Sequence, residues 1–406
     1  MTIRTIPSRR FRRLKTFDLK RLIHPVDPET FKRDYWEKRP LIIRRSDPDY
    51  YRGLLCFADI DRLLSMSTAW SPQIRVVRDR KDVSPQNLAR EGLFGNVIDL
   101  ESLYAEYRRG ATVVLQFLHE RWPPLVDLCR VLGGEFSAAF QVNAYLTPAR
   151  EQGLRTHYDT HDVFVLQSEG SKHWRIYDDP VRLPLDAQPY DGTAQAGRVT
   201  EEFDLHPGDF VYIPRGWQHD AATGESTSLH LTVGINTITW AALLLRAVGS
   251  VIEGDARYRE SPPIGFANDP VRLQQAAARL AALLNGLIEQ IEPAQLVHDA
   301  AQEALYGRHA ALEGHFLDLE RLPHVDLHTR VRRRTDVPFS LVTKEDSAAL
   351  HFHGKAVEMP AHTEVDLRFI SEAGDFRASD LPGRLDDAGR LVLVHALIRE
   401  GFLTIS

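Results

Sequence analysis

The sequence predicts a mixed α and β fold with an antiparallel β-barrel at its centre. Residues 142–233 are rich in β-branched and aromatic residues and are interrupted by glycine and proline, a pattern typical of short antiparallel strands. After Trp240 the composition changes to alanine- and leucine-rich helix, and strand-like and helix-like stretches alternate again from Pro338. We therefore expect a double-stranded β-helix (jelly-roll) core, followed by a helical segment and a C-terminal domain that looks like a winged helix.

Chain length and composition indicate several domains in a globular protein. A chain of 406 residues is too long for a single hydrophobic core. Its hydrophobic content of 43% and charged content of 26% are ordinary, and its net charge of −6 excludes a general polyanion binder. We expect four parts: a basic arm over 1–21, the barrel domain over 22–239, the helical segment over 240–325 and the winged-helix-like domain over 335–406.

Cysteine usage and hydropathy bear on the compartment. Cys56 and Cys129 lie far apart and outside any C-x-x-C motif, which fits a reducing cytoplasm and argues against a disulfide framework or a cysteine zinc site. No apolar run approaches the roughly eighteen residues of a membrane span, and the N-terminus lacks the apolar region of a signal peptide. We expect a cytoplasmic protein without a membrane partner.

The first 21 residues are strongly basic. They hold one acid, Asp18, against eight cations: Arg4, Arg9, Arg10, Arg12, Arg13, Lys15, Lys20 and Arg21. Such an arm can contact RNA phosphates or an acidic partner, but basic termini are more often frayed and solvated. The winged-helix-like tail lacks a basic recognition helix, so we do not expect direct nucleic-acid binding.

Short helices and strands alternate before the barrel. Pro28 can open a helix with an apolar stripe of Phe31, Tyr35 and Trp36. The other elements predicted here are strands over Leu41–Ile43 and Gln73–Asp79, helices over Phe57–Met66, Ile98–Arg109 and Pro123–Leu132, and a buried strand in ATVVLQFL. These elements should cover the barrel.

Five stretches predict barrel strands. QVNAYLTP alternates in polarity, so Gln141, Asn143 and Tyr145 should share one face. DVFVLQ and KHWRIY read as a hairpin around Gly170. GDFVYIP and SLHLTVGI predict two further strands.

The helices after the barrel carry unusually wide apolar faces. They read WAALLLRAVGSVIEG, DPVRLQQAAARLAALLNGLIEQI and PAQLVHDAAQEALYG. Faces of this width suit a layer that packs against a second copy of the chain, and they also suit a bundle within one chain. Periodicity alone leaves both arrangements open.

Three residues have the composition of a mononuclear metal site. His157 and Asp159 form an H-x-D pair, whose side chains would share a face in a strand. His219 follows PRGWQ, which we place at the far end of the strand that opens with PGD. Two imidazoles and one carboxylate form the facial triad of non-haem Fe(II) oxygenases, whereas a structural zinc site would need a fourth protein ligand.

A lysine across the Gly170 turn suggests a second ligand. Lys172 is an odd cation in an apolar stretch, and burial of its ammonium without a partner would cost several kcal/mol. A bound carboxylate is a natural partner, as a dicarboxylate cosubstrate would supply. Asn143, Tyr145 and Thr232 are candidate hydrogen-bonding residues that would orient it.

Each histidine can also be explained without a role as a metal ligand. An H-x-D pair alone is weak evidence, and His161, His173 and His230 compete as ligands. His230 shares a strand face with Thr232 in apolar surroundings. We expect His230 to be a hydrogen-bonded histidine in the core or behind the ligands, and not a ligand itself.

Two motifs carry a resemblance to a known family. HYDTHDVFVLQSEGSKHW and PGDFVYIPRGWQH resemble the JmjC-type, cupin-4 group of Fe(II)/2-oxoglutarate oxygenases. Within that group they look like the ribosomal oxygenase branch, which includes a bacterial ribosomal-protein arginine hydroxylase and human ribosomal-protein histidine hydroxylases. FKRDYWEKRPLII, the helical segment and the tail follow in the family order, so the resemblance covers the chain from about Leu22.

The resemblance implies roles for individual residues. It makes His157, Asp159 and His219 the Fe(II) ligands and Lys172 the anchor for the distal carboxylate of 2-oxoglutarate. It matches Asn143, Tyr145 and Thr232 to pocket positions and the helical segment to a homodimer interface. The implied activity is an O₂-consuming dioxygenase that hydroxylates an arginyl or histidyl side chain of a protein substrate, most typically a ribosomal protein.

This chain differs from the family's pattern at one position, and three rival functions must be considered. The bacterial arginine hydroxylase uses arginine as its cosubstrate anchor, whereas this chain has Lys172, like the human histidine hydroxylases, which leaves the target residue open. The rivals are a hydroxylase of a ribosomally made peptide or other protein, a histone-type lysine demethylase, and a non-catalytic cupin-like binding or scaffold protein. No chromatin-reading module or zinc cluster accompanies the barrel, and the intact triad with Lys172 argues against a scaffold.

Overall fold

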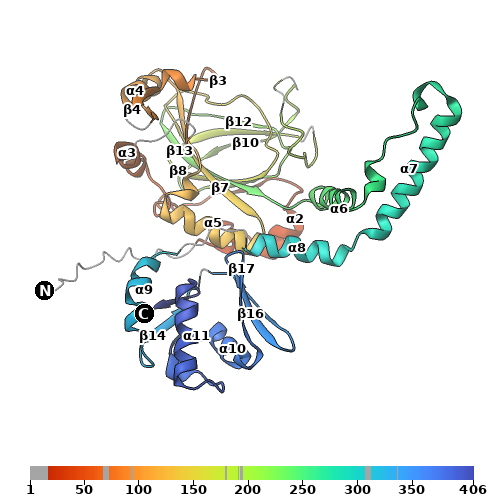
Figure 1. Cartoon of the computed structure of the whole chain (residues 1–406). Coiled ribbons are helices and arrows are strands. Elements are labelled where there is room, and N and C mark those ends of the chain that lie inside the picture. The colour runs from red at the N-terminus through yellow and green to blue at the C-terminus, as the bar shows by residue number, and fades with distance from the viewer. Residues whose placement is uncertain are drawn as a thin grey trace, which may run out of the picture. The chain divides into compact units, whose positions relative to one another are not determined.

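The computed structural model describes residues 17–66, 73–92, 95–178, 181–190, 192, 195–306, 312–335 and 337–406. They belong to two compact units, Met1–Thr237 and Ile238–Ser406 (Figure 1). Most of the predicted basic arm, from Arg4 to Lys15, lies outside the described residues. Its last two cations, Lys20 and Arg21, belong to helix α1 (Leu19–Leu22).

The helices of the first unit begin at residues that can cap them. In α2 (Pro28–Asp34) the Asp27 carboxylate accepts hydrogen bonds from the backbone N–H groups of Glu29 and Thr30, at 3.0 and 3.1 Å, and proline occupies the first position. The other helices are α3 (Phe57–Met66), α4 (Leu100–Arg108) and α5 (Pro123–Phe136), with short 3₁₀ turns at Pro85–Asn87 and Leu118–Glu120. Each falls within a few residues of its predicted range.

Most strands of the first unit belong to two antiparallel sheets that face each other across a pocket. The larger has eight strands in the order β1-β11-β8-β13-β7-β6-β2-β3, and the smaller has the order β10-β9-β12. The large-sheet strands are β1 (Leu41–Ile43), β2 (Ile74–Arg78), β3 (Lys81–Asp82), β6 (Thr112–Leu115), β7 (Ala139–Thr147), β8 (Asp162–Glu169), β11 (Phe210–Ile213) and β13 (Ser228–Asn236). The small-sheet strands are β9 (Lys172–Tyr177), β10 (Val199–Leu205) and β12 (His219–Ala222), and β4 (Ala89–Gly92) pairs separately with β5 (Gly95–Ile98). The mixed, cupin-like architecture is as predicted.

The hairpin predicted around Gly170 is wrong. β8 pairs with β11 and β13, whereas β9 pairs with β10 and β12, so the turn carries the chain from the large sheet to the small one. Gly170 has a φ of +62°, and a Cβ at this position would overlap the carbonyl oxygen of Thr227. The glycine therefore permits a sharp passage between sheets, which a local sequence pattern does not distinguish from a hairpin turn.

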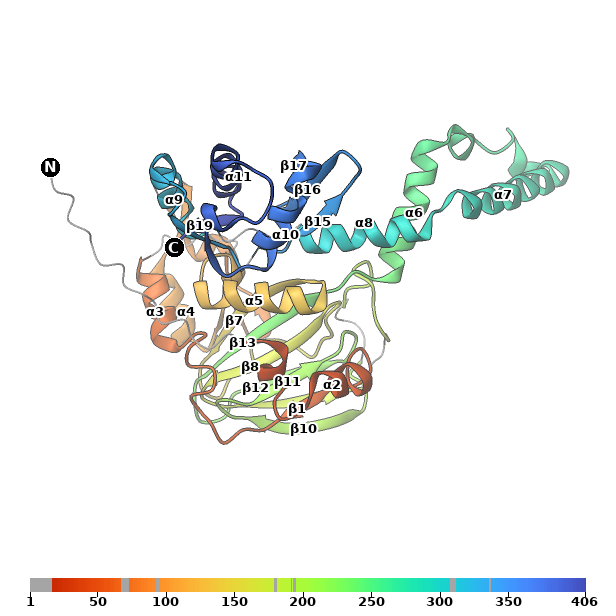
Figure 2. The ribbon, with the colours of Figure 1, turned by 90° about the horizontal axis from the view of Figure 1, so that it is seen from below.

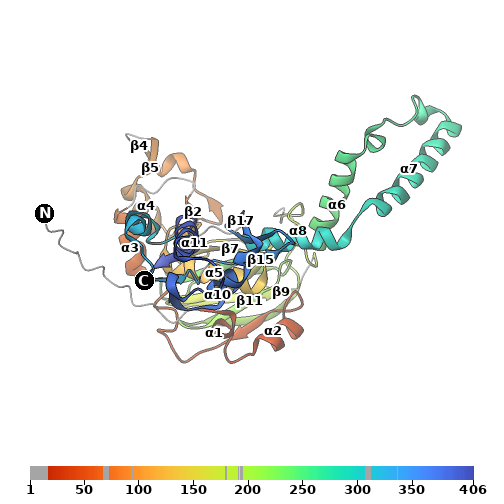
Figure 3. The ribbon, with the colours of Figure 1, turned by 60° about the horizontal axis from the view of Figure 1, so that its bottom comes forward.

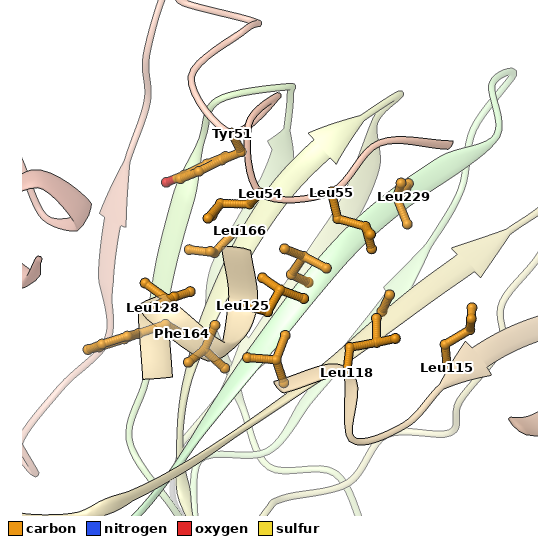
Figure 4. Close-up of a cluster of buried hydrophobic side chains, with 14 of the residues drawn as sticks. Tyr51, Leu54, Leu55, Leu115, Leu118, Leu125, Leu128, Phe164, Leu166 and Leu229 are labelled. Carbon is orange, nitrogen blue, oxygen red and sulfur yellow. The ribbon is translucent and has the colours of Figure 1, made fainter. Parts of the chain in front are cut away.

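Hydrophobic cores lie on both faces of the large sheet. On the outer face α5 runs along the sheet (Figure 2), and its Leu125 and Leu128 pack in one cluster with Phe164 and Leu166 of β8 (Figure 4). Between the two sheets a smaller cluster includes Val163, Val165, Trp174, Ile176, Phe203, Leu205, Val211 and Ile213. Alternate residues of β8 thus face different cores, which explains why this strand is apolar almost throughout.

The second unit starts with three helices that bury little of their apolar surface. They are α6 (Trp240–Gly254), α7 (Pro270–Gln290) and α8 (Pro293–Tyr306). Figure 3 shows α6 and α7 as long arms connected at their far ends. No residue of α7 is buried, and Leu245 of α6 and Ile288 of α7 are 72% and 70% exposed. The alternative of a closed bundle within one chain is therefore wrong.

The C-terminal residues form their own core from short helices and two three-stranded sheets. The helices are α9 (His315–Arg321), α10 (Glu364–Glu372) and α11 (Asp387–Arg399). One sheet contains β18 (Asp375–Arg377), β14 (Arg330–Arg333) and β19 (Leu403–Ile405), and the other contains β15 (Ser340–Thr343), β16 (Ser347–Phe352) and β17 (Lys355–Pro360). The alternating strands and helices expected from Pro338 are present. The sequence RVRRR contains β14, the central strand of the first of these two sheets. No helix in the described part of the chain has the length and apolar character that crossing a bilayer requires.

Candidate active site

His157, Asp159 and His219 come together at the junction of the two sheets. Among the described residues they form the one group of three or more potential metal-binding side chains, with ligand atoms all within 4.8 Å of one another. His157 Nε2 lies 3.9 Å from Asp159 Oδ1, and His219 Nε2 lies 3.8 Å from Asp159 Oδ2. This donor set and spacing suit a single ion of the non-haem iron type.

The backbone that carries these residues differs from the prediction. His157 and Asp159 precede β8 and do not lie in a strand, although His157 forms an isolated bridge with His219 through hydrogen bonds of 3.1 and 2.8 Å. His219 begins β12 and does not end β11, because the chain turns at Gly216, whose φ is +90°. The Gly216 N–H donates to the carbonyl oxygen of Asp159 at 3.1 Å, which joins the two ligand-bearing segments.

The hydrogen bonds of both imidazoles leave the correct nitrogen available for a metal. His157 Nδ1 lies 2.7 Å from the carbonyl oxygen of Arg155, and His219 Nδ1 lies 3.1 Å from that of Trp217. A carbonyl oxygen can only accept a hydrogen bond, so each Nδ1 carries the ring proton. Each Nε2 then has a free lone pair on the side facing Asp159, where an ion would bind. The residues therefore fit a divalent ion.

Electrostatics keep this group ready to bind a cation at neutral pH. Burial, and then the neighbouring His157, lower the pKa of His219 to about 4. Burial acts to raise the pKa of Asp159, but His157, His161 and His219 outweigh it and lower that pKa below its usual value. A neutral imidazole and an ionised carboxylate are the ligand forms that a metal requires.

Lys172 lies deep in the same pocket without a counter-ion. Its side chain is 5% exposed, and its ammonium donates to Thr147 Oγ1 at 3.1 Å. Within the described ranges no carboxylate lies within 4 Å of it, and burial lowers the pKa of Lys172 to about 7. A buried ammonium with one neutral hydrogen-bond partner is costly, so the site is suited to an anion.

The predicted orienting residues are linked to one another. Tyr145 and Asn143 share the pocket face of β7, and Asn143 lies opposite Thr232 in the β7–β13 register. Asn143 Oδ1 accepts from the N–H of Phe117 at 3.1 Å, so its amide nitrogen is the end left for the pocket. All three line a pocket of about 710 Å³, open mouth included, together with Lys172 and the triad.

The competing histidines do not belong to the metal-binding group. His173 is on the outer side of β9 and contacts Asp204 and Glu202 at 2.8 and 3.0 Å. His230 is buried and stacks on Tyr145 with ring centres 4.9 Å apart. The expected hydrogen bond of His230 is missing at Nδ1, which is buried without a partner in the described part of the chain. His161 lines the pocket.

One pocket residue and three buried residues outside the pocket lining escaped the sequence interpretation. Thr147 follows Tyr145 by two positions on β7, so the alternation that selected Gln141, Asn143 and Tyr145 would have found it one step further along. Trp174 was missed because an aromatic residue in a strand looks like core. The buried pair of Arg215 and Asp162, 2.7 Å apart, was also missed, because no local pattern links residues so distant in sequence.

Comparison with known proteins agrees with the geometry. Residues 121–243, which span β7 to β13 and contain all seven predicted site residues, match the JmjC domain model. The chain contains a JmjC domain. It is 32% identical to ribosomal oxygenase 2 of Bos taurus over 66% of this chain and 58% of the relative. It is 34% identical to a bifunctional lysine-specific demethylase and histidyl-hydroxylase of Drosophila persimilis over 53% of this chain and 31% of the relative.

A solved structure shares the fold of this JmjC protein. The Escherichia coli ribosomal oxygenase YcfD, in complex with cobalt and succinic acid, matches with a TM-score of 0.51 at 17% identity, covering 94% of this chain and 99% of YcfD. These similarities confirm the resemblance to ribosomal oxygenases that the two motifs indicated. The chain spans somewhat more than half the length of the first curated relatives, at 58% and 59%.

Proposed function

We propose that this protein is an Fe(II)- and 2-oxoglutarate-dependent dioxygenase that adds one hydroxyl group to a side chain of a ribosomal protein. One observation carries the proposal: a group of two imidazoles and one carboxylate shares a pocket with a buried lysine that has no counter-ion among the described residues. The first fits a catalytic iron and the second fits the far carboxylate of a dicarboxylic cosubstrate.

The proposed ligands are His157, Asp159 and His219. Bound there with 2-oxoglutarate and O₂, Fe(II) supplies the oxidising power for hydroxylation of an unactivated C–H bond. The protein's own contribution is to hold its ligands in the metal-binding form, through the carbonyl oxygens of Arg155 and Trp217. Three protein ligands leave the remaining positions for the cosubstrate and O₂.

The proposed cosubstrate residues are Lys172, Asn143, Tyr145 and Thr232. The Lys172 ammonium would bind the distal carboxylate, with Thr147 fixing its direction. The β7–β13 register and the hydrogen bond from Phe117 N–H to Asn143 Oδ1 hold these side chains in place before the ligand arrives. Such preorganisation reduces the cost of ordering side chains on binding. The E. coli neighbour was solved with cobalt and succinic acid, which is consistent with a metal and a dicarboxylate in this fold.

The ribosomal substrate is proposed from the relatives. Ribosomal oxygenases of several vertebrates match this chain, and the name of one insect relative specifies histidyl hydroxylation. Because the chain spans only part of these proteins, their activities remain proposals for it. Arginine and histidine are both candidate targets at this stage.

The rest of the chain is assigned within the same proposal. We assign catalysis to 22–239, homodimer formation to 240–325, a winged-helix-like fold to 335–406, and an accessory basic arm to 1–21. The exposed apolar side chains of α6 and α7 support the dimer, because a second copy would bury them. Two free cysteines, Cys56 and Cys129, support a reducing, cytoplasmic location.

Intact mass measurement tests the function directly. Ribosomal proteins from cells with and without this gene should differ by one oxygen atom in a single protein, and fragmentation should locate the modified residue. Complementation with a His157→Ala variant is the matched control and should leave the mass unmodified. No change in any ribosomal protein would refute the ribosomal substrate. That result would point to a ribosomally made peptide or another protein as the substrate. If the wild-type protein turned over no 2-oxoglutarate, a non-catalytic scaffold would be favoured instead.

A further inference from the structure

The residue after His219 is a buried carboxylate, Asp220, to which the proposed reaction assigns no role. Its side chain is 4% exposed and accepts hydrogen bonds from three other side chains. The Thr156 hydroxyl donates to Oδ2 at 2.7 Å, the Tyr177 hydroxyl donates to the same oxygen at 2.8 Å, and Arg175 Nε donates to Oδ1 at 3.0 Å. Burial of a carboxylate is costly, and these charge-assisted hydrogen bonds offset that cost.

The three donors lie outside the metal pocket. Thr156, Arg175 and Tyr177 line a second, open pocket, and none of them belongs to the lining of the first, whereas Asp220 borders both. Successive side chains of a strand point to opposite faces, so His219 faces the metal pocket while the Asp220 carboxylate turns to its donors. The carboxylate is therefore placed to support the centre from outside it.

Asp220 joins the two segments that carry the candidate histidine ligands. Thr156 directly precedes His157, and the hydrogen bond from Thr156 to Asp220 links residues 64 positions apart in the sequence. His157 does not lie in a strand, and its backbone meets that of His219 in an isolated bridge with hydrogen bonds of 3.1 and 2.8 Å. The Thr156–Asp220 hydrogen bond adds a side-chain link beside this bridge. Together these contacts hold two imidazole rings whose centres are 4.6 Å apart.

The third segment that contacts Asp220 is β9. Asp220 lies opposite Arg175 in the β12–β9 register, and two guanidinium nitrogens lie 3.0 and 2.9 Å from Asp220 Oδ1. Arg175 and Tyr177 thus fix the carboxylate to a regular strand, whereas Thr156 belongs to a segment without regular structure. Of the three donors, Thr156 is the one whose own position depends most on the bond to Asp220.

We propose that Asp220 and Thr156 form a positioning pair that fixes the distance between the His157 and His219 imidazoles. Neither residue is a ligand; each acts through the histidine next to it in the chain. Metal affinity depends on how firmly the ligands are oriented, and loss of a supporting hydrogen bond typically lowers that affinity about 10- to 100-fold. The inference rests on the proposed metal-dependent function and adds two residues to its site.

Substitutions at the two hydroxyl donors test the pair, because both hydroxyls donate to the same oxygen. Thr156→Val keeps nearly the shape of threonine and removes the bond between the ligand segments. Tyr177→Phe removes a bond of almost equal length, 2.8 against 2.7 Å, that leads only to β9. Thr156→Ser keeps the hydroxyl. The Co²⁺ affinity, the visible absorption of bound Co²⁺ and the thermal unfolding midpoint are measured for each full-length apoprotein.

We expect Thr156→Val to raise the Kd for Co²⁺ at least about tenfold and to shift the absorption bands of the bound ion, because the imidazoles are less firmly oriented. Tyr177→Phe should change that Kd by less than about twofold, although each variant loses one hydrogen bond to a buried carboxylate and should unfold at a similarly lowered temperature. Thr156→Ser should restore both the affinity and the spectrum.

Three results would overturn the positioning pair while the proposed function stands. Wild-type Co²⁺ affinity in Thr156→Val would show that the backbone bridge alone fixes the imidazoles. Equal losses of affinity in Thr156→Val and Tyr177→Phe would show that Asp220 needs its donors only for folding. A Thr156→Ser protein as weak as Thr156→Val would show that the hydroxyl has no part in metal binding. If the wild-type protein binds no Co²⁺, the proposed metal centre fails first and the pair fails with it.

Discussion

Among the described residues, polar groups inside the barrel are buried without their full set of partners, whereas large apolar side chains along α6 and α7 are exposed. The first kind includes the Lys172 ammonium, which has one neutral partner and no counter-ion, and His161 Nδ1; the second includes Leu245 and Ile288. Both conditions are unfavourable for an isolated chain. They call for different partners, however: a small charged ligand for the barrel and a second protein surface for the helices. If the two conditions are independent, a substitution that affects one should leave the other unchanged.

The largest effect is expected at the candidate metal ligands. Replacing His219 with alanine removes one of three ligands, so metal binding should fall below detection and hydroxylation should be lost, by about a thousandfold or more. Calorimetric titration of the apoprotein with Co²⁺ or Mn²⁺ measures this without turnover. His173→Ala, on the outer side of β9, is the control and should bind metal as the wild type does. Equal metal affinity in both variants would contradict the proposed centre.

A second substitution should separate ligand binding from folding. Lys172→Met removes the buried charge, and we expect the Kd for 2-oxoglutarate to rise about 100-fold, or about 2.7 kcal/mol. The same variant should unfold at a higher temperature than the wild type in the absence of cosubstrate, because it buries no unpaired ammonium. Lys172→Arg, which keeps the cation, should lose less affinity. A Lys172→Met protein with normal 2-oxoglutarate affinity would exclude the proposed anchor.

The sequence foretold the pocket better than it foretold the path of the chain through it. Alternation within one strand was enough to put Gln141, Asn143 and Tyr145 on one face, because side-chain direction in a strand is a local property. The partners of a strand are not local. The turn at Gly170 looks the same whether the next strand folds back or crosses to the other sheet, and only the register of β8 with β13 decides it. The contact of Thr156 and Asp220 was equally hidden, since it joins segments that lie far apart in the sequence.

In the helical segment the sequence predicts the helices themselves but not what they pack against. Its helices follow from periodicity and composition, and capping residues such as Asp269, which accepts from Val271 N–H at 2.9 Å, mark where they begin. What covers their apolar faces could not be predicted, because a face of a given width fits an intrachain or an interchain neighbour equally well. The exposure of α7 in the folded chain removes the first alternative.

A charge placed on the helical surface should disrupt assembly without affecting the pocket. Leu245→Arg introduces a cation at a residue that is 72% exposed in the single chain, and we expect the dimer Kd to rise at least about tenfold. Sedimentation velocity over a concentration series measures this, and 2-oxoglutarate affinity measured in parallel should be unchanged. Ser250→Arg adds the same charge to the same helix at an exposed polar position and should leave the dimer intact. A wild-type protein that is monomeric throughout would contradict the proposed interface.

The smallest expected effect is a pH dependence of cosubstrate binding. Burial lowers the pKa of Lys172 to about 7 from its ordinary 10.5, so between these values the unfolded chain holds a proton that the folded, ligand-free chain has lost. The free energy of unfolding of the ligand-free protein should therefore rise with pH across this window. Binding of a carboxylate requires the protonated amine, so 2-oxoglutarate affinity should fall above about pH 7, towards a limit of about tenfold per pH unit.

Calorimetry in buffers of different ionisation enthalpy can detect the linked proton. Cosubstrate binding at about pH 8 should take up close to one proton in the wild type and none in Lys172→Met, whose affinity should be low and independent of pH. The titration of His219 does not interfere, because its pKa of about 4 lies well below this range. If wild-type affinity were constant between about pH 7 and pH 8.5, Lys172 would either remain protonated without its ligand or not contact the carboxylate. A monomeric Leu245→Arg variant should take up the same proton when 2-oxoglutarate binds. That result would show that cosubstrate binding in the barrel does not depend on the contacts made by the helices.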